Sequence, residues 1–547
     1  MDLIIKDLIL LVAVNSTYQH AAFGLRYLKA NLNELTSQCV IKEFTIAQEA
    51  KDIAEQILKM NPRIIGIGVY IWNTELVLEI LQIIRKVTPE KVIVLGGPEI
   101  SYETHTQPHI HFADYIIPGE ADLSFYRLCK KILSTKSDNI VSNENFPPDV
   151  KKLASILPVE IPEISQIQLP YNLYTTEDVK NRVIYVEASR GCPYKCEYCL
   201  SSLDKSVRNF NLELFLKAME DLLAKGVKEF KFVDRTFNLS PNISQNILHF
   251  FLQNIDKNLF LHFELVPDRL PEELKSLIKQ FPAGSLQFEV GIQTLNDNVS
   301  KNVSRRQNVE KIKDNFKYLR NETHVHTHAD LIVGLPGETL ESFKVGFDEL
   351  FSMGPDEIQV GILKRLKGTP IIRHDQEFQM KYSDNSPFQI LQNKHLSFYE
   401  VQKMVRFSKF WDMIANSGNW KTFVEQLKIH TNKNNQSFFQ NFMLLTHFLQ
   451  TRHGLSHGIS LIHLAESIFI YMNEELKWST DLAIEVLIDD YCLRKRRDLP
   501  PFIKNSIYKN QALERISLAA RPSSTLCDDK TTNSGIKSVK KRQLQHL

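Results

Sequence analysis

The chain has 547 residues, which is too long for one ordinary domain; at roughly 150 residues per domain, about three or four are expected. Hydrophobic residues make up 43% and charged residues 24%, which is the balance of a folded globular protein and excludes a chain that is disordered throughout. The formal net charge of +2 argues against a polyanion binder that works by bulk charge. The longest apolar run near the start, residues 8–14, is far shorter than a membrane span, so we expect no membrane partner and a cytoplasmic location.

Residues 1–135 alternate strand and helix patterns, which predicts a doubly wound, Rossmann-like α/β domain. Short apolar runs rich in β-branched residues are typical of parallel strands buried on both faces. Such a sheet binds its ligand beyond the carboxyl ends of the strands. The candidate ligand contacts at those ends are Asn15, Ser16, Trp72, Gly96, Gly97, Gly119 and Glu120. Because a tight strand-to-helix turn needs glycine in any case, a ligand site and a purely structural turn are both open at this point.

Three further regions follow the first domain. Residues 136–178 are polar and contain several prolines, which predicts a linker. Residues 179–385 resume the strand–helix alternation with six βα units, which predicts a partial (β/α)6 TIM-type barrel with its chemistry at the carboxyl ends of the strands. Residues 386–520 are expected to form a mostly α-helical domain, and the Ser/Thr/Lys-rich residues 521–547 a disordered tail.

Three of the seven cysteines lie within eight residues, directly after the first strand of the expected barrel. Cys192, Cys196 and Cys199 have the spacing C-x3-C-x2-C. Three thiolates on one loop can each bind one iron of a 4Fe–4S cluster and leave the fourth iron open. Zinc is the alternative, but zinc sites usually have four Cys or His ligands, and the next cysteine, Cys492, is almost 300 residues away. We therefore interpret the three cysteines as cluster ligands and as the catalytic centre.

The cysteine spacing, with Tyr198 directly before the last cysteine, resembles the signature of the radical S-adenosylmethionine (SAM) superfamily. In that family the open iron binds SAM, and the reduced cluster cleaves it to methionine and a 5′-deoxyadenosyl radical. Residues 183–369 are similar to the coproporphyrinogen dehydrogenase-type and methylthiotransferase-type barrels of the family. Positions that match the family's motifs imply cofactor contacts from Tyr198, Asp234, Glu264, Glu289, Gln293, Arg305 and Asp330.

The spacing of the residues along the fourth strand agrees with these contacts. Glu289, Gly291 and Gln293 alternate, so they point to one face, where the glycine leaves room for a ligand. A carboxylate and an amide there can hold ribose hydroxyls. The Arg305 guanidinium can bind the SAM carboxylate, although Arg306 could equally supply that contact.

Four features of the barrel sequence need separate comment. Glu264, like Glu289, could pair with a Lys or Arg inside the barrel. Asp234 stands where the family has a glycine-rich loop that binds the SAM amine, and this sequence lacks those glycines. His328 is the histidine nearest the carboxyl end of the fifth strand and the candidate to reach substrate. Residues 334–338 match a family motif but also suit a tight strand-to-helix joint.

A doubly wound domain before a radical SAM barrel resembles the cobalamin-binding domain of cobalamin-dependent radical SAM enzymes. The resemblance implies that the turns at Gly96–Gly97 and Gly119 close a hydrophobic slot for the nucleotide tail of cobalamin. No D-x-H-x-x-G motif occurs in the sequence, so a histidine from the protein is not expected beneath cobalt. Tyr70, Trp72 or a water molecule is the candidate there.

Within the expected helical domain, residues 388–501 resemble the uncharacterised carboxy-terminal domain that accompanies these proteins. We expect Trp411 and Trp420 to pack in its core rather than to close over the barrel. Together the resemblances imply a cobalamin-dependent radical SAM methyltransferase. Its substrate would be a small molecule or peptide with an unactivated carbon, and its electron donor a protein such as flavodoxin or ferredoxin. A cobalamin-assisted radical rearrangement and a tRNA- or RNA-modifying radical SAM enzyme are the alternatives. Near-zero net charge argues against nucleic acid, and we expect the basic run at residues 494–497 to be a solvated helix end.

Overall fold

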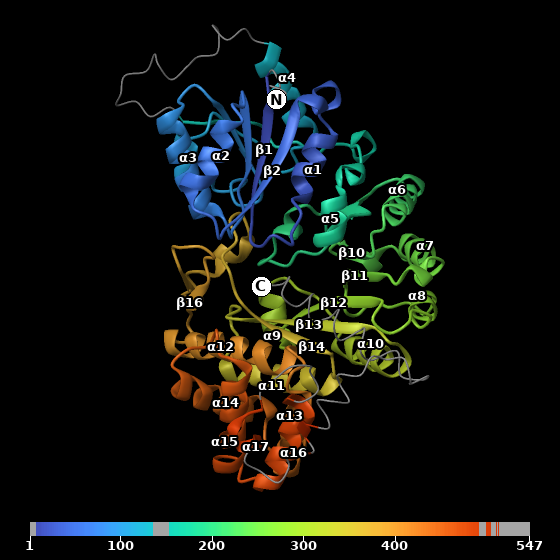
Figure 1. Cartoon of the computed structure of the whole chain (residues 1–547), viewed down its shortest axis with the longest axis vertical. Coiled ribbons are helices and arrows are strands. Elements are labelled where there is room, and N and C mark those ends of the chain that lie inside the picture. Colours follow the sequence, from blue (N-terminus) through green and yellow to red (C-terminus); the bar gives the residue numbers. More distant parts are fainter. Residues whose placement is uncertain (1–6, 135–152, 492–498, 505–509, 511, 514–547) are drawn as a thin grey trace. The chain divides into compact units, whose positions relative to one another are not determined.

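The computed structural model describes residues 7–134, 153–491, 499–504, 510 and 512–513 (Figure 1). These residues form two compact units. The first comprises the described residues of Met1–Glu264, Lys364–Arg373 and Tyr382–Gln389, and the second comprises those of Leu265–Leu363, His374–Lys381 and Ile390–Leu547. Cys492, the basic run at 494–497 and the predicted tail at 521–547 lie outside the described residues. In the part of the chain that the structure describes, no helix has both the length and the apolar character that crossing a membrane requires.

The N-terminal part of the first unit is built on a six-stranded parallel sheet with strand order β2-β1-β3-β4-β5-β6. Its strands are β1 (Ile9–Asn15), β2 (Cys39–Thr45), β3 (Ile64–Gly68), β4 (Val92–Gly96), β5 (Tyr115–Ile116) and β6 (Ser155–Ile156). The chain order reverses where β1 lies between β2 and β3. Doubly wound sheets bind their ligands beside such a reversal, at the carboxyl ends of the strands.

Helices cover both faces of this sheet, as Figure 1 shows for α2 and α3 on one side of β1 and α1 on the other. These helices are α1 (Phe23–Ala30), α2 (Ala50–Lys59), α3 (Thr74–Val87) and α4 (Asp122–Ser134). Alternate residues of β1 enter different cores: Leu10 and Val12 pack with α2 and α3, whereas Ile9 and Leu11 pack with α1 and α4. The predicted doubly wound architecture is therefore confirmed.

The segment predicted as a linker contributes to the first unit. β6 pairs in parallel with β5 and adds the last strand to the sheet. Helix α5 (Thr176–Asn181) begins at a capping box made by Thr175 and Asp178. The Asp178 carboxylate also lies 2.9 Å from the Arg26 guanidinium, and Arg26 lies 2.8 Å from Glu43, so buried ion pairs tie this segment to α1 and β2. A two-residue strand has no alternation to detect, which is why the sequence pattern predicted only a linker.

The strands of the expected barrel are divided between the two units, and in each unit they are parallel. In the first unit β10 (Glu229–Phe232) pairs with β7 (Ile184–Val186) and with β11 (Phe260–Leu265). In the second, β13 (His326–Val333) pairs with β12 (Leu286–Gln293) and β14 (Glu357–Ile362). The helices between them are α6 (Leu212–Ala224), α7 (Pro241–Leu252), α8 (Glu272–Ile278), α9 (Asp297–Asn302), α10 (Val309–Glu322) and α11 (Leu340–Met353). This alternation is the predicted α/β pattern.

The rest of the second unit is helical, as expected, after the short strands β15 (Lys381–Tyr382) and β16 (Ile390–Gln392). Its helices are α12 (Phe398–Trp411), α13 (Lys421–Lys433), α14 (Phe438–His453), α15 (Leu461–Glu474), α16 (Thr480–Tyr491) and α17 (Pro501–Lys504). A π-helical turn, Asp412–Asn416, continues α12. Trp411 and Trp420 are buried, as predicted.

Side chains at the end of α12 bind the backbone of β14. The indole N–H of Trp411 donates to the Ile358 carbonyl oxygen at 2.7 Å. The Asn416 amide donates to the same oxygen at 2.9 Å and accepts from the Ile358 N–H at 3.2 Å. Ser408 donates to the Val360 carbonyl oxygen at 2.6 Å. The helical region is thus attached to the outer strand of this part of the barrel by four hydrogen bonds.

Candidate active site

The three cysteines lie on one loop whose ends are joined by a short antiparallel ribbon in the first unit. The ribbon consists of β8 (Ser189–Arg190) and β9 (Arg208–Asn209). Gly191 opens the loop with φ of +89°, and a Cβ at this position would lie 2.1 Å from the Ser206 carbonyl oxygen. Only glycine fits this conformation and this space. The N–H of Cys192 then donates to the Asp204 carbonyl oxygen at 2.8 Å, which closes the loop on itself.

The thiols of this loop have different degrees of burial. Cys192 and Cys196 are buried and Cys199 is partly exposed, and none of the three forms a disulfide. Burial, together with the neighbouring thiols of Cys199 and Cys196, raises the pKa of Cys192. Within the described ranges, no group of three or more His, Cys, Asp or Glu side chains is arranged to hold a single metal ion. Three thiols on one loop are nevertheless the donor set of a cluster with one open iron, so these residues fit that group, and their role as ligands stays a prediction.

Two acidic residues predicted to contact SAM are bonded to protein groups in the first unit. The Asp234 carboxylate accepts hydrogen bonds from the Ala188 N–H at 3.0 Å and from the Ser189 hydroxyl at 2.6 Å, and burial raises its pKa to about 7. It therefore holds the chain just before the cysteine loop. Glu264 lies 2.7 Å from the Arg235 guanidinium, which is the ion pair considered as the alternative for this residue. A SAM contact from either carboxylate stays a prediction.

Gly291, Gln293 and Arg305 come together in the second unit at the carboxyl end of β12. The β12–β13 register shifts between Gly291 and Gln293, and Gln293 has φ of +70°. A Cβ on Gly291 would lie 2.7 Å from the Gln293 amide nitrogen and 3.7 Å from an Arg305 nitrogen. Arg305 donates to the Gly291 carbonyl oxygen and, at 2.9 Å, to the Gln307 side chain. The bulge thus gathers an amide and a guanidinium, the groups predicted to hold the ribose and the carboxylate of SAM.

Carboxylates and a histidine form a row across the strands of the second unit. Glu289 stands opposite His328, and His328 opposite Glu357, in the strand register. His328 is buried and its Nε2 lies 3.1 Å from Gln359 Oε1 and 3.3 Å from Asp330 Oδ1. Although burial lowers the pKa of His328, its acidic neighbours outweigh that effect and raise it to about 9. The protonated His328 ring therefore supplies the positive charge among the neighbouring carboxylates. Burial raises the pKa of Asp330.

The turn after β13 is a compact joint. Gly334 and Gly337 have φ of +94° and +91°, which favours glycine at both positions. The Glu338 carboxyl that follows is buried and accepts a hydrogen bond from the Thr294 hydroxyl at 2.8 Å. Its second oxygen has no hydrogen-bond partner among the described residues. Burial therefore raises the pKa of Glu338 to about 7.

A cavity of about 380 Å³ lies in the first unit, beyond β3 and β4 and between α1 and α4. Four of the predicted cofactor contacts line it, namely Gly96, Gly97, Gly119 and Glu120. Its walls are largely apolar and include Leu25, Leu28 and Phe125. A Cβ on Gly97 would lie 2.6 Å from the Val69 carbonyl oxygen, so glycine is required where the floor of the cavity turns. A glycine floor with apolar walls fits the nucleotide tail of cobalamin, the ligand that the resemblance implies.

The remaining predicted contacts lie beside this cavity rather than in its lining. The Asn15 amide is buried and donates to a Glu43 carboxylate oxygen at 2.9 Å. The Trp72 ring stacks on the Tyr70 ring, with centroids 4.5 Å apart, and only Tyr70 belongs to the lining. Ser16 also lies outside the lining. Contacts of Asn15, Ser16 and Trp72 with a cofactor stay predictions.

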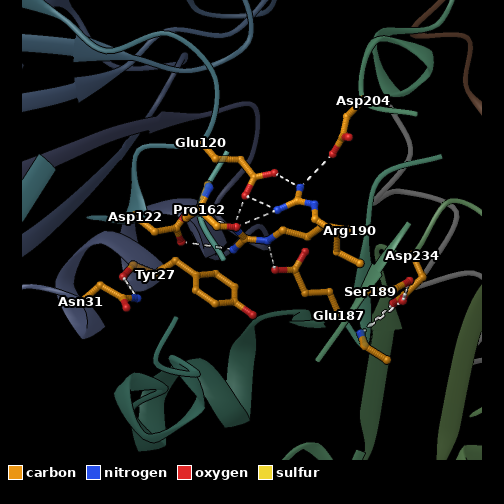
Figure 2. A network of polar contacts seen from close by, with 12 residues as sticks. Tyr27, Asn31, Glu120, Asp122, Pro162, Glu187, Ser189, Arg190, Asp204 and Asp234 are labelled. Atoms are coloured by element: carbon orange, nitrogen blue, oxygen red, sulfur yellow. Dashed lines mark hydrogen bonds and ion pairs between the residues drawn. The ribbon is translucent and has the colours of Figure 1, made fainter. Parts of the chain in front are cut away.

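An arginine network that the sequence analysis missed connects the cavity with the cysteine loop (Figure 2). The Arg190 guanidinium lines the cavity and donates to Glu120 at 2.8 Å, to Asp122 at 2.9 Å and to Glu187 at 2.8 Å. Arg208, which stands opposite Arg190 in the ribbon, also binds Glu120. The sequence signal was the position of Arg190, a charged residue directly before the glycine that opens the cysteine loop.

Residues 364–373, which follow β14, belong to the first unit and carry a second set of ion pairs. The pairs are Arg365 with Glu103, Lys367 with Glu99, and Arg373 with Glu197. Glu197 stands between Cys196 and Cys199, whereas Glu99 and Glu103 follow the Gly96–Gly97 turn of the cavity. One segment therefore contacts both the cysteine loop and the domain that contains the cavity.

Models of three known families match the chain, one after another. The B12 binding domain matches residues 9–128, the radical SAM superfamily matches residues 186–350, and a family of proteins of unknown function, DUF4080, matches residues 376–544. Their order is that of the three predicted domains. The resemblances inferred from the sequence are thereby confirmed.

Individual relatives are distant but cover much of the chain. An uncharacterized methyltransferase of Pyrococcus horikoshii is 24% identical over 410 residues, which are 70% of this chain and 85% of that protein. The cobalamin-dependent radical SAM methyltransferase TokK of Streptomyces tokunonensis is 22% identical over 335 residues, 56% of this chain and 47% of TokK, so the match spans about half of TokK. Among solved structures, the cobalamin-dependent S-adenosylmethionine radical enzyme OxsB, with aqua-cobalamin and SAM bound, has a TM-score of 0.56 at 14% identity. That match covers 98% of this chain and 84% of the OxsB chain, and it shows a shared fold.

Proposed function

The chain is a cobalamin-binding radical SAM protein, and from this premise we propose that it transfers a methyl group to an unactivated carbon of a small-molecule or peptide substrate. The observation that carries the proposal is that one compact unit contains both a glycine-floored cavity and a loop with three cysteines. Similarity to TokK, a cobalamin-dependent methyltransferase, supports methyl transfer over a rearrangement. A cobalamin-assisted rearrangement remains the second candidate, which the experiments below distinguish.

Different residues of the chain would hold the cluster, SAM and cobalamin. When bound, a 4Fe–4S cluster supplies the electron that cleaves SAM to methionine and a 5′-deoxyadenosyl radical, and cobalamin supplies the methyl group. Cys192, Cys196 and Cys199 would hold the cluster. The Gln293 amide and the Arg305 guanidinium would orient the ribose and the carboxylate of SAM. The apolar walls of the cavity would keep water away from a reactive radical.

Anaerobic reconstitution with iron and sulfide tests the radical SAM part of the proposal. We expect the reconstituted protein, with dithionite and SAM, to release 5′-deoxyadenosine, measured by liquid chromatography and mass spectrometry. Cys196→Ala should abolish this release and lower the bound iron. Cys129→Ala is the matched control, because Cys129 is buried in the core of the same unit, where burial raises the pKa of its thiol and keeps it unreactive. Equal release from Cys196→Ala and wild type would contradict the proposal.

Absorption titration with hydroxocobalamin tests the cavity. Gly96 lines it, and a Cβ there would meet only the Ile117 carbonyl oxygen, at 3.5 Å, so a larger side chain can extend into the cavity without backbone strain. Gly96→Leu should therefore keep the thermal unfolding midpoint of wild type and lose cobalamin binding by about tenfold or more. Unchanged binding by this variant would show that the cavity is not the cobalamin site.

Isotope labelling distinguishes methyl transfer from rearrangement. With SAM that carries a CD3 group, methyl transfer requires S-adenosylhomocysteine to appear in the presence of cobalamin and reductant, and the product gains the labelled methyl group. A rearrangement leaves the mass of the substrate unchanged and releases no S-adenosylhomocysteine. Release of 5′-deoxyadenosine alone would therefore favour the second candidate.

We further propose that a flavodoxin or ferredoxin supplies the electrons and that the reaction takes place in the cytoplasm. None of the described cysteines forms a disulfide, which supports a reducing compartment, because thiols in an oxidising one form disulfides. Loss of the visible absorption of the cluster on addition of reduced flavodoxin tests the donor. If neither reduced flavodoxin nor reduced ferredoxin lowers the absorption of the cluster, this choice of donor is contradicted.

A further inference from the structure

The Glu120 carboxylate pairs with Arg190, as Figure 2 shows, and also with Arg208. These two arginines stand opposite each other at the base of the cysteine loop. Arg190 donates to one carboxylate oxygen of Glu120 at 2.8 Å, and Arg208 binds the other oxygen. The two arginines are neighbours across the β8–β9 ribbon, whereas Glu120 belongs to the N-terminal domain, 70 residues before Arg190. A single carboxylate of the cobalamin-binding domain therefore holds both strands from which the cysteine loop extends.

The ion pairs around Glu120 are largely shielded from water, so water cannot easily take the place of either partner. The side chains of Arg190 and Arg208 are only 13% and 17% exposed. Arg190 also lies over the Tyr27 ring of α1, with 4.5 Å between its guanidinium carbon and the ring centroid. The two guanidinium groups face four carboxylates in all, those of Glu120, Asp122, Glu187 and Asp204. If either arginine withdrew, partly buried carboxylates would lose their counter-ion, so the ribbon is fixed in place.

The backbone of the same turn forms part of the cavity. Gly119 precedes Glu120 with φ of +72°, and both residues line the cavity. The Gly119 N–H donates to the Ser101 hydroxyl at 3.0 Å, and that hydroxyl donates to the Gly97 carbonyl oxygen at 2.8 Å. The two glycine turns of the cavity are therefore bonded to each other and, through Glu120, to the base of the cysteine loop.

We propose that Glu120 is a positioning residue that fixes the cysteine loop relative to the cobalamin cavity and so sets the separation between the two cofactors. This inference rests on the proposed function, since it assumes that the cysteines hold a cluster and the cavity holds cobalamin. Weakening the Glu120 contacts should leave each cofactor bound but allow the loop to move. A displacement of about 1 Å is enough to impair a reaction that depends on alignment.

Pulsed dipolar electron paramagnetic resonance measures this separation directly, because the reduced cluster and cob(II)alamin each carry an unpaired electron. The experiment uses the full chain loaded with both cofactors. Wild type should give one narrow distance distribution, and Glu120→Gln, which keeps the size of the side chain and removes its charge, should broaden or shift it by about 1 Å or more. Glu160→Gln is the matched control, because Glu160 pairs with Arg127 in the same unit but both side chains are about half exposed. Its distribution should match that of wild type.

A second variant separates positioning from direct contact with cobalamin. Glu120 lines the cavity, whereas Arg208 does not, so Arg208→Lys alters only the base of the loop. Lysine keeps the charge but lacks the fork that grips a carboxylate. This variant should bind cobalamin as wild type does and still broaden the distribution. Unchanged distributions in both Glu120→Gln and Arg208→Lys would overturn the proposal. The iron, sulfide and cobalamin contents of wild type are measured first. If wild type does not bind both cofactors, the proposed function fails, whatever the role of Glu120.

Discussion

Replacing Glu338 with Gln should stabilise the protein at neutral pH and above and have little effect near pH 4.5. The pKa of this buried carboxyl is about 7 in the folded chain, against an ordinary value of 4.5. Because the folded state binds the proton more tightly than the unfolded state, the stability that the neutral carboxyl provides is complete below about pH 4.5 and is lost as the pH rises through 7. The difference corresponds to about 3 kcal/mol at pH 8. Glutamine keeps an acceptor for the Thr294 hydroxyl and is never ionised, so the variant escapes this loss.

Urea unfolding at several pH values, followed by tryptophan fluorescence, measures the effect. Three of the four tryptophans, Trp411, Trp420 and Trp478, lie in the second unit with Glu338, so the signal reports mainly on that unit. The free energy of unfolding of Glu338→Gln should equal that of wild type near pH 4.5 and exceed it by about 2–3 kcal/mol near pH 8. Glu341→Gln, a change of an exposed carboxylate three residues further on, is the control and should show no such trend. A difference that does not change with pH would refute the argument.

Three other substitutions test contacts elsewhere in the chain. Gly291→Ala should weaken SAM binding by about tenfold or more in equilibrium dialysis, because the added Cβ would lie 2.7 Å from the Gln293 amide nitrogen; unchanged affinity would argue against this end of β12 as the SAM site. Trp411→Phe should lower the free energy of unfolding of the second unit by about 1–3 kcal/mol, because the Ile358 carbonyl oxygen loses one donor and the smaller ring leaves a void. A stability equal to that of wild type would contradict this prediction. Arg26→Met should destabilise the first unit by about 3 kcal/mol, because two buried carboxylates lose one of their two guanidinium partners and keep only Arg182. Arg127→Met, at an exposed ion pair, should cost about 1 kcal/mol or less in the same urea experiment, and equal effects of the two changes would count against the reasoning.

The sequence predicted the parts of the fold in which a pattern repeats over several residues. The strand β1, Ile9–Asn15, overlaps the apolar run at residues 8–14, because a strand buried on both faces must be apolar throughout. The two-residue strands β6, β8 and β9 escaped prediction for the opposite reason, since two residues contain no period. They form only because neighbouring strands and side chains are already in place.

In the candidate site, too, features that follow a local sequence pattern were predicted, and features that depend on the tertiary fold were not. Regular alternation along one strand and a fixed spacing after it predicted that Gln293 and Arg305 serve the same site, but the bulge that interrupts the alternation between Gly291 and Gln293 was not predicted. The ion pair of Arg190 with Glu120 was not, because it joins residues 70 positions apart and depends on how the domain and the loop fold. Asp234 shows a further limit of the same kind. It stands at the position of the family's glycine-rich loop, but only the structure reveals that its carboxylate accepts a hydrogen bond from the backbone before the cysteine loop.

The hydrogen bonds that α12 and the π-helical turn make to Ile358 and Val360 have a consequence for the solubility of the chain. In the second unit β14 is an outer strand, and an outer strand with unpaired N–H and C=O groups is a template on which another molecule can add a strand. Asn416 satisfies both backbone groups of Ile358, as a neighbouring strand would, without offering an edge of its own. A chain cut after β14 should therefore self-associate through that edge. By this argument, the region that matches a family of unknown function protects the enzyme from aggregation.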